Sequence, residues 1–233
     1  MNDKIKSLIK SYYKNFPKWD SVIRNFIDVT YLDKKFDDDK HFEIIDNAKD
    51  MFGDFVEIFI QAGKFKEVWS DLYFIPYPFG LNTIIKAEKI GCDFEFGIDE
   101  KGFRLETFIS NPENIKYMSD EFWYNILKLT ELGEFEFDEN FSLASIEAKK
   151  AEKKFNGKKS HLFRFIRDYF ILELYEEDLL NIGSFSISWL PNISWDKLIE
   201  VGSQSFKILY KINYSLWRAG YLAEKKSKIK NGV

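Results

Sequence analysis

The stretch that decides the fold reads Cys92-Asp93-Phe94-Glu95-Phe96-Gly97-Ile98-Asp99-Glu100-Lys101-Gly102-Phe103-Arg104-Leu105-Glu106. Its apolar residues alternate with polar residues or glycine on both sides of the Asp99–Gly102 turn. This period of two predicts two antiparallel strands with one buried face. We therefore expect a hairpin in which Ile98 lies opposite Phe103 and Phe96 lies opposite Leu105.

The same pairing gathers charge on the other face of the hairpin. Asp93, Glu95, Arg104 and Glu106 would share that face. Carboxylates that gather in this way can hold Mg²⁺, which prefers hard oxygen ligands. The alternative is an ordinary solvated sheet face on which Arg104 relieves the repulsion between the acids.

A second acidic strand follows at Glu134-Phe135-Glu136-Phe137-Asp138. Side chains two residues apart on a strand lie about 7 Å from each other, since each residue rises about 3.3 Å. Three acids in this arrangement favour either a solvated face or a patch for a basic partner. The candidate acidic face for a partner or a metal therefore consists of Asp93, Glu95, Glu106, Glu134, Glu136 and Asp138.

Further elements are expected on both sides of the hairpin. Period-two alternation predicts strands at 72–75, 82–87 and Ser184–Trp189. Apolar stripes at helical spacing predict helices from Trp19 to Thr30, from the acidic start Asp37–Asp39 to Gly63, from Ser119 to Gly133, and at 144–155. Residues 162–174 are dense in apolar side chains and are ambiguous between strand and helix.

A last helix is expected to begin at Ser194, with Gly220 and a basic tail after it. Its stripe from Trp195 to Trp217 spans about 35 Å, enough to pack across strand Ser184–Trp189 and close the core. Because no linker divides the chain, we expect one α+β domain with a helical part at 1–70, a sheet-containing part at 71–222 and a basic tail at 223–233.

Composition narrows the class of protein. The chain has 233 residues, of which 45% are hydrophobic and 31% charged, so it is expected to fold around a core of its own. The lone Cys92 cannot form a disulfide within the chain, and with only two histidines a Cys/His zinc site would need carboxylates. Cys92 is expected to be a buried small residue, and no cofactor is expected.

The formal net charge of −4 argues against an overall basic footprint for nucleic acid. One local basic patch, Lys158, Lys159, Arg164 and Arg167, is interleaved with aromatic residues. Such a patch could meet phosphate or an acidic protein, or could be the outer face of a core element.

The N-terminus lacks the apolar core of a signal peptide, and no run of 18 apolar residues occurs. A cytoplasmic location without membrane contact is therefore expected. Richness in Lys, Ile, Asn and Phe is typical of an AT-rich coding genome, which suggests a bacterial or phage source.

Common catalytic motifs are missing: there is no G-x-x-x-x-G-K-[ST], G-x-G-x-x-G, G-x-S-x-G or H-E-x-x-H. Asp138 with Glu147-x-Lys149 resembles the motif of the metal-dependent PD-(D/E)xK nucleases, in which the acids bind the metal and the lysine polarises the attacked group. The resemblance covers residues 138–149 only, Phe137 stands where that family has proline, and Glu147 falls in helical sequence. The chain is therefore not assigned to that family.

These observations favour a non-catalytic macromolecule-binding protein, such as an immunity protein, an antitoxin, or a phage-defence or counter-defence factor. Its expected partner is another protein, since the net charge does not favour nucleic acid. The alternative is a metal-dependent nuclease or phosphoester hydrolase that uses a carboxylate cluster. The sequence does not specify an oligomeric state.

Overall fold

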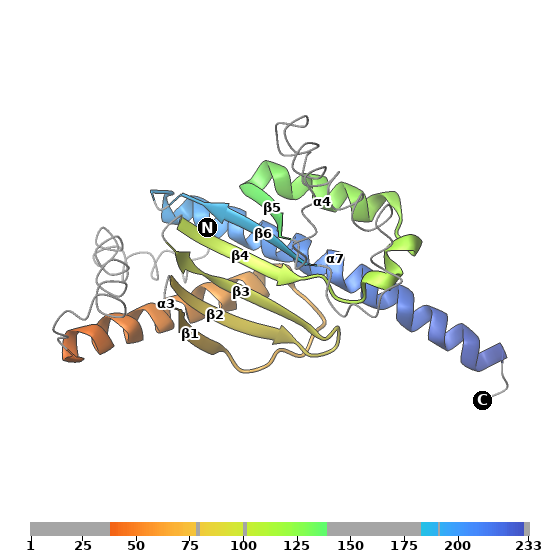
Figure 1. Ribbon diagram of the computed structural model, residues 1–233, viewed down its shortest axis with the longest axis horizontal. Coiled ribbons are helices and arrows are strands. Elements are labelled where there is room, and N and C mark those ends of the chain that lie inside the picture. The colour runs from red at the N-terminus through yellow and green to blue at the C-terminus, as the bar shows by residue number, and fades with distance from the viewer. Residues whose placement is uncertain (1–37, 78–79, 100–101, 139–182, 191, 231–233) are drawn as a thin grey trace, which may run out of the picture.

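The computed structural model describes residues 38–77, 80–99, 102–138, 183–190 and 192–230. Over these residues the chain has an α+β fold, a six-stranded antiparallel sheet with helices packed on it (Figure 1). The helices expected before residue 38 and at 144–155, the ambiguous stretch 162–174, and the basic patch of Lys158, Lys159, Arg164 and Arg167 lie outside the described residues.

The sheet begins as a meander and then changes its order. Strands β1 (Tyr73–Tyr77), β2 (Gly80–Ala87), β3 (Cys92–Asp99) and β4 (Gly102–Phe108) follow one another along the chain and in space. Strand β6 (Ser184–Trp189) pairs with β4, and β5 (Glu134–Asp138) pairs with the far side of β6. The strand order is therefore β1-β2-β3-β4-β6-β5, with every pair antiparallel.

The register of the central hairpin is the expected one. Ile98 pairs with Phe103 and Phe96 pairs with Leu105. These side chains and Phe94 are almost completely buried, so the alternation identified the buried face correctly. The bounds of β5 and β6 also agree with the expected strands.

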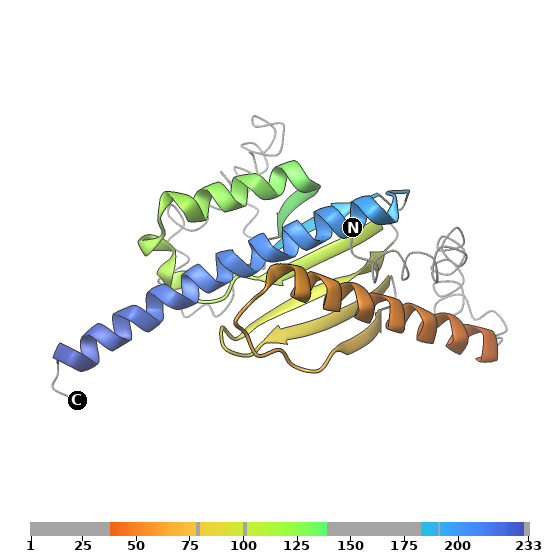
Figure 2. The ribbon, with the colours of Figure 1, turned by 180° about the vertical axis from the view of Figure 1, so that it is seen from behind.

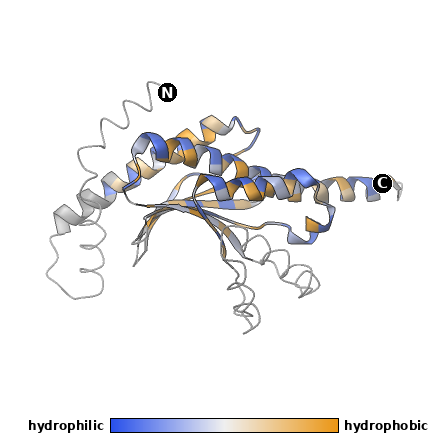
Figure 3. Ribbon diagram, turned by 90° about the horizontal axis from the view of Figure 1, so that it is seen from above, coloured by the Kyte–Doolittle hydropathy of each residue, from blue (hydrophilic) through white to orange (hydrophobic). Residues whose placement is uncertain are grey.

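Three helices cover the apolar face of the sheet (Figures 2 and 3). They are α3 (Asp38–Gly63), α4 (Asp120–Leu132) and α7 (Trp195–Lys230), and a short 3₁₀ helix, η2 (Pro112–Tyr117), precedes α4. The start of α3 in the acidic cluster and its end at Gly63 match the expectation, as do the Ser119 N-cap and Gly133 C-cap of α4.

Aromatic rings make up the centre of the core. The ring of Phe96 lies edge-to-face with Phe52, Phe55 and Phe59 of α3, at centroid distances of 5.5, 6.0 and 5.1 Å. The ring centroid of Phe206 in α7 lies 4.8 Å from that of Phe94, which is also in β3. Edge-to-face pairs add attraction between α3 and β3 beyond the burial of apolar area, and the tilted Phe94–Phe206 pair places α7 against the same strand.

A buried polar cluster ties α7 to the sheet. Asn213 of α7 donates a hydrogen bond to Thr107 Oγ1 at 3.1 Å and accepts one from the backbone N–H of Ser110 at 3.0 Å. The hydroxyl of Thr107 in turn lies 3.0 Å from Cys92 Sγ. Because Asn213 has no exposed surface, each of these bonds replaces a bond to water.

Helix α7 differs from the expectation in its length. Gly220 lies inside the helix, and the expected basic tail is helical as far as Lys230. The 36 residues span about 54 Å at 1.5 Å per residue, more than the expected 35 Å. An interior glycine costs a helix only about 1 kcal/mol, and here it leaves room for Asn114 of η2, whose Nδ2 would lie 2.8 Å from an added Cβ.

Candidate functional site

The face of the sheet opposite the helices is polar over its central strands. The register of the paired strands places the side chains of this face in rows across the sheet. We call this surface the polar sheet face. Its described polar side chains are Asn82, Lys86, Asp93, Glu95, Arg104, Glu106, Glu134, Glu136, Ser184, Ser186 and Ser188. The two acidic strands recognised in the sequence therefore contribute to one face.

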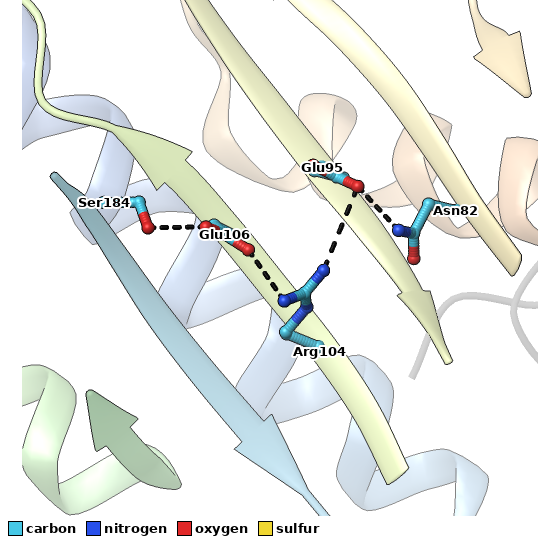
Figure 4. A network of polar contacts seen from close by, with 5 residues as sticks. All are labelled: Asn82, Glu95, Arg104, Glu106 and Ser184. Carbon is cyan, nitrogen blue, oxygen red and sulfur yellow. Dashed lines mark hydrogen bonds and ion pairs between the residues drawn. The ribbon is translucent and has the colours of Figure 1, made fainter. Parts of the chain in front are cut away.

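Two carboxylates lie directly opposite each other on this face. Glu95 of β3 pairs with Glu106 of β4, an arrangement that is destabilising for like charges unless a cation lies between them. Arg104 supplies that cation, with one guanidinium nitrogen 3.1 Å from Glu106 Oε2 and another 4.0 Å from Glu95 Oε1 (Figure 4). The expected pairing of Arg104 with the acids is thus present.

Each acid also accepts a hydrogen bond from a neutral side chain. Ser184 Oγ donates to Glu106 Oε1 at 2.5 Å, and Asn82 Nδ2 donates to Glu95 Oε1 at 2.6 Å (Figure 4). The Glu106 side chain is 11% exposed and that of Glu95 is 17% exposed. Carboxylates that are this buried need such partners, because an unpaired charge costs several kcal/mol.

Gly97 makes the position of Asn82 possible. The two residues lie opposite each other on β2 and β3, and a Cβ at position 97 would lie 1.9 Å from Asn82 Oδ1. Any side chain at residue 97 would therefore displace the amide that binds Glu95. The glycine that breaks the alternation of charges in β3 is a requirement of the network.

The surroundings of Glu95 change its acidity. Burial raises the pKa of Glu95 above its ordinary value of 4.5, and the charge of Glu106 adds to that effect. Arg104 and the hydrogen bond from Asn82 lower the pKa, but by less than burial and Glu106 together raise it. Glu95 therefore takes up a proton more readily than a solvated glutamate does.

The remaining candidate acids whose side chains are described are exposed. Glu136 shares a row with Glu106, but Ser186 of β6 stands between them, so their backbones are two strand spacings, or about 10 Å, apart. Glu134, Glu136 and Asp93 are exposed, and only the backbone of Asp138 is described. The structure thus brings Glu95 and Glu106 together and leaves Glu136 separate from them.

This arrangement satisfies charges without presenting a set of metal ligands. In the part of the chain that the structure describes, no group of three or more His, Cys, Asp or Glu side chains converges to hold a metal ion. Chemically, the network can exchange a proton at Glu95 or bind a cation in competition with Arg104.

Two members of the network had no clear signal in the sequence. Asn82 stands at the start of an expected strand, and nothing near it indicates a partner in β3. The serines of β6 alternate with Phe185, Ile187 and Trp189. This alternation showed that the serines lie on one side of the strand, but it did not show which strand lies beside them.

A second surface is formed by the end of α7, which extends beyond the sheet (Figures 1 and 2). We call residues Arg218–Lys230 the α7 projection. All residues from Tyr221 to Ile229 are exposed, including Leu222 at 43% and Ile229 at 70%. Over the described residues, no helix is both long and apolar enough to span a bilayer.

A column of aromatic rings leads along α7 into the projection. Tyr210, Tyr214, Trp217 and Tyr221 follow one another with centroid distances of 5.9, 5.5 and 5.3 Å. Lys89 places its ammonium group 5.3 Å from the Tyr214 ring centre and 4.9 Å from that of Trp217. Trp217, the last residue of the expected apolar stripe, packs against the core but is only partly buried, and its ring also contacts Tyr214 and Tyr221.

Comparison of the chain with protein-family models, with curated proteins and with solved structures finds no match in any of the three.

Proposed function

We propose that this chain is a non-catalytic macromolecule-binding protein and that its partner is another protein. The observation that supports the proposal is the α7 projection, in which three large apolar side chains, Tyr221, Leu222 and Ile229, are exposed on a helix that has passed the sheet. The fold leaves Ile229 70% exposed and buries only about half of the surface of Tyr221 and Leu222. Apolar groups held in water on a rigid helix are a common means of binding a partner.

The polar sheet face supports the non-catalytic part of the proposal. Glu95 and Glu106, the two most buried of its acids whose side chains are described, are already engaged by Arg104, Asn82 and Ser184. Groups paired in this way act as structure rather than as free acids or bases. Immunity proteins, antitoxins, and phage-defence or counter-defence factors of bacteria and phages work by binding of this kind.

Affinity capture tests the proposal. The full chain, tagged at its N-terminus so that α7 stays free, is purified from its source cell, and co-purifying proteins are identified by mass spectrometry. The expected result is one protein in fixed stoichiometry, which is then purified separately and re-forms a complex with this chain in gel filtration with light scattering. If no protein re-forms a stoichiometric complex, the proposed function is wrong.

A second candidate function is a metal-dependent nuclease or phosphoester hydrolase that uses Glu95 and Glu106. The observation that favours it is the raised pKa of Glu95 beside a second buried carboxylate, since such shifts are common at catalytic sites. Nuclease assays with Mg²⁺ and Mn²⁺ on single- and double-stranded substrates test it. Activity that Glu95→Gln abolishes and the exposed control Glu136→Gln leaves unchanged would favour the hydrolase over the binding protein.

A further inference from the structure

We infer that the α7 projection binds as a helix in an acidic, apolar groove of the partner protein; this inference rests on the proposed function. Four residues of the projection, Arg218, Leu222, Lys225 and Ile229, follow one another at spacings of four, three and four. At 3.6 residues per turn, these spacings place all four on one face of the helix. The face therefore alternates a cation with an exposed apolar side chain.

The geometry of this stripe specifies the groove. Leu222 and Ile229 are seven residues apart, or about 10.5 Å along the helix axis. A matching groove has two apolar hollows at that separation, with carboxylates placed for Arg218 and Lys225. This is the helix-in-groove mode of recognition, with one cation before the first apolar anchor and one between the two anchors.

Charge distribution favours an acidic partner at this place. Residues 218–230 contain five basic side chains and one acidic one, a formal charge of +4, whereas the whole chain carries −4. The other residues together therefore carry −8. An acidic protein is repelled by most of this molecule and attracted by the projection, which orients the encounter.

A single-stranded nucleic acid fits the surface less well. Bases would need ring faces on which to stack, but Trp217 is stacked on Tyr221 and packs at a tilt against Tyr214, and Lys89 lies over Tyr214 and Trp217. Contacts of lysine with phosphate would also leave Leu222 and Ile229 in water. The exposed apolar side chains thus favour a protein partner.

A second copy of this chain and a lipid surface fit less well for a different reason. In a parallel pair of projections, Arg218 would face Arg218 and Lys225 would face Lys225, and in an antiparallel pair Leu222 would face Lys225. A helix that lies on a membrane needs a continuous apolar face, and here Arg218 and Lys225 interrupt it.

The test compares the unchanged chain with four variants of it. Titration calorimetry measures the affinity of each for the purified partner, identified by capture as above, and stopped-flow fluorescence measures the rate of association. Leu222→Ala/Ile229→Ala should weaken binding about a hundredfold, because each is expected to be an anchor worth about tenfold or more. Arg218→Gln/Lys225→Gln should slow association and reduce its dependence on salt.

Matched controls lie on the same fold. Lys207→Gln/Lys211→Gln removes two exposed lysines of α7 outside the projection, and Tyr124→Ala removes an exposed aromatic side chain of α4. Both are expected to bind the partner as the unchanged chain does. Circular dichroism should show the same melting temperature for all variants, because every substituted residue is exposed.

The outcomes separate the inference from the proposed function. A partner that binds both projection variants with unchanged affinity overturns the inference and leaves the proposed function intact, whereas the absence of any stoichiometric partner overturns both. The purified chain is also titrated with oligo-dT and with phosphatidylserine vesicles. Binding to either that Arg218→Gln/Lys225→Gln removes and Leu222→Ala/Ile229→Ala retains would identify an anionic polymer or lipid as the occupant and overturn the inference.

Discussion

Cys92 and Glu95 stand on the same strand and point to opposite faces of the sheet, and burial changes the acidity of both. Cys92 faces the core, where burial raises the pKa of its thiol to about 12. Glu95 faces the polar sheet face, where burial raises the pKa of its carboxyl, with Arg104 opposing the shift. In each case the neutral form of the side chain is favoured.

The thiol of Cys92 is expected to resist labelling by DTNB in the folded protein. A pKa of about 12 in place of 9.0 lowers the thiolate fraction at neutral pH about a thousandfold, and the thiolate is the reactive form. Labelling should become rapid once urea unfolds the chain. As a control, Lys207→Cys in a Cys92→Ala background should react at once, since residue 207 is exposed. Equally fast labelling of native Cys92 would contradict its burial.

Glu95 is expected to make stability fall as pH rises. Its folded-state pKa is raised, so between the ordinary value of 4.5 and the folded-state value the native chain binds more protons than the unfolded chain. The contribution of protonated Glu95 to stability is therefore complete below 4.5 and is lost as pH rises through the folded-state pKa.

Glu95→Gln should remove this dependence, because the glutamine side chain does not titrate. Urea unfolding of both proteins, at pH values rising from 4.5, should show the variant gaining stability relative to the unchanged chain. The exposed Glu136→Gln serves as the control and should show no such trend. A difference that stays constant with pH would show that Glu95 is not the titrating group.

At the scale of elements, the crossing of α3 and α7 depends on a glycine. A Cβ at Gly202 would lie 2.7 Å from the ring of Phe59, which has no exposed surface and itself contacts Phe96. Gly202 therefore allows the two helices to approach closely over β3. Helix propensity would favour alanine at this position, so the packing of the pair has overridden the local preference.

Gly202→Ala should lower the free energy of unfolding by about 1–3 kcal/mol, because overpacking forces Phe59 to move within a filled core. Gly53→Ala in α3 is the matched control, since its Cβ would meet only Leu72 Cδ1 at 3.5 Å, an ordinary contact. That control should be neutral or more stable by up to about 1 kcal/mol. Equal effects of the two substitutions in urea unfolding would mean that α3 and α7 are not in close contact.

At the scale of the whole molecule, α7 has two parts with different tasks. Its first part buries Phe206, Leu209, Ile212 and Leu216 completely against the rest of the fold. Its last part, the α7 projection, is exposed from Tyr221 to Ile229. The continuously exposed residues begin directly after Gly220, where Asn114 of η2 packs against the helix.

Two truncations should separate these tasks. A chain ending at residue 193 loses the buried stripe and should be insoluble or should bind ANS as a molten state. A chain ending at Gly220 keeps the buried stripe and should unfold in one transition, seen alike by circular dichroism and tryptophan fluorescence, close to the midpoint of the full chain. Loss of folding in the longer of these two chains would show that the projection belongs to the core.

Local patterns predicted the elements themselves. The alternation in β3, β4 and β6 showed where the strands run and which face carries the apolar core, because adjacent side chains on a strand point to opposite sides. It did not show that Glu106, Ser184 and Ser186 on the other face are buried as well. The stripes and caps of α3 and α4 predicted their bounds for the same reason, since helical spacing and end groups are read within a few residues. The pairing of Arg104 with its neighbouring acids followed from the register of one short hairpin.

Tertiary structure alone decided the strand order and the full extent of α7. Strand β6 lies between β4 and β5, which brings Ser184 to Glu106 across 78 positions of sequence, and no local pattern carries information about such a pairing. Glycine is a common residue at the end of a helix, so the sequence predicts that the last helix ends at Gly220, yet α7 continues through it. A glycine ends a helix only when the chain turns there, and at Gly220 the side chain of Asn114 packs into the space that a Cβ would fill.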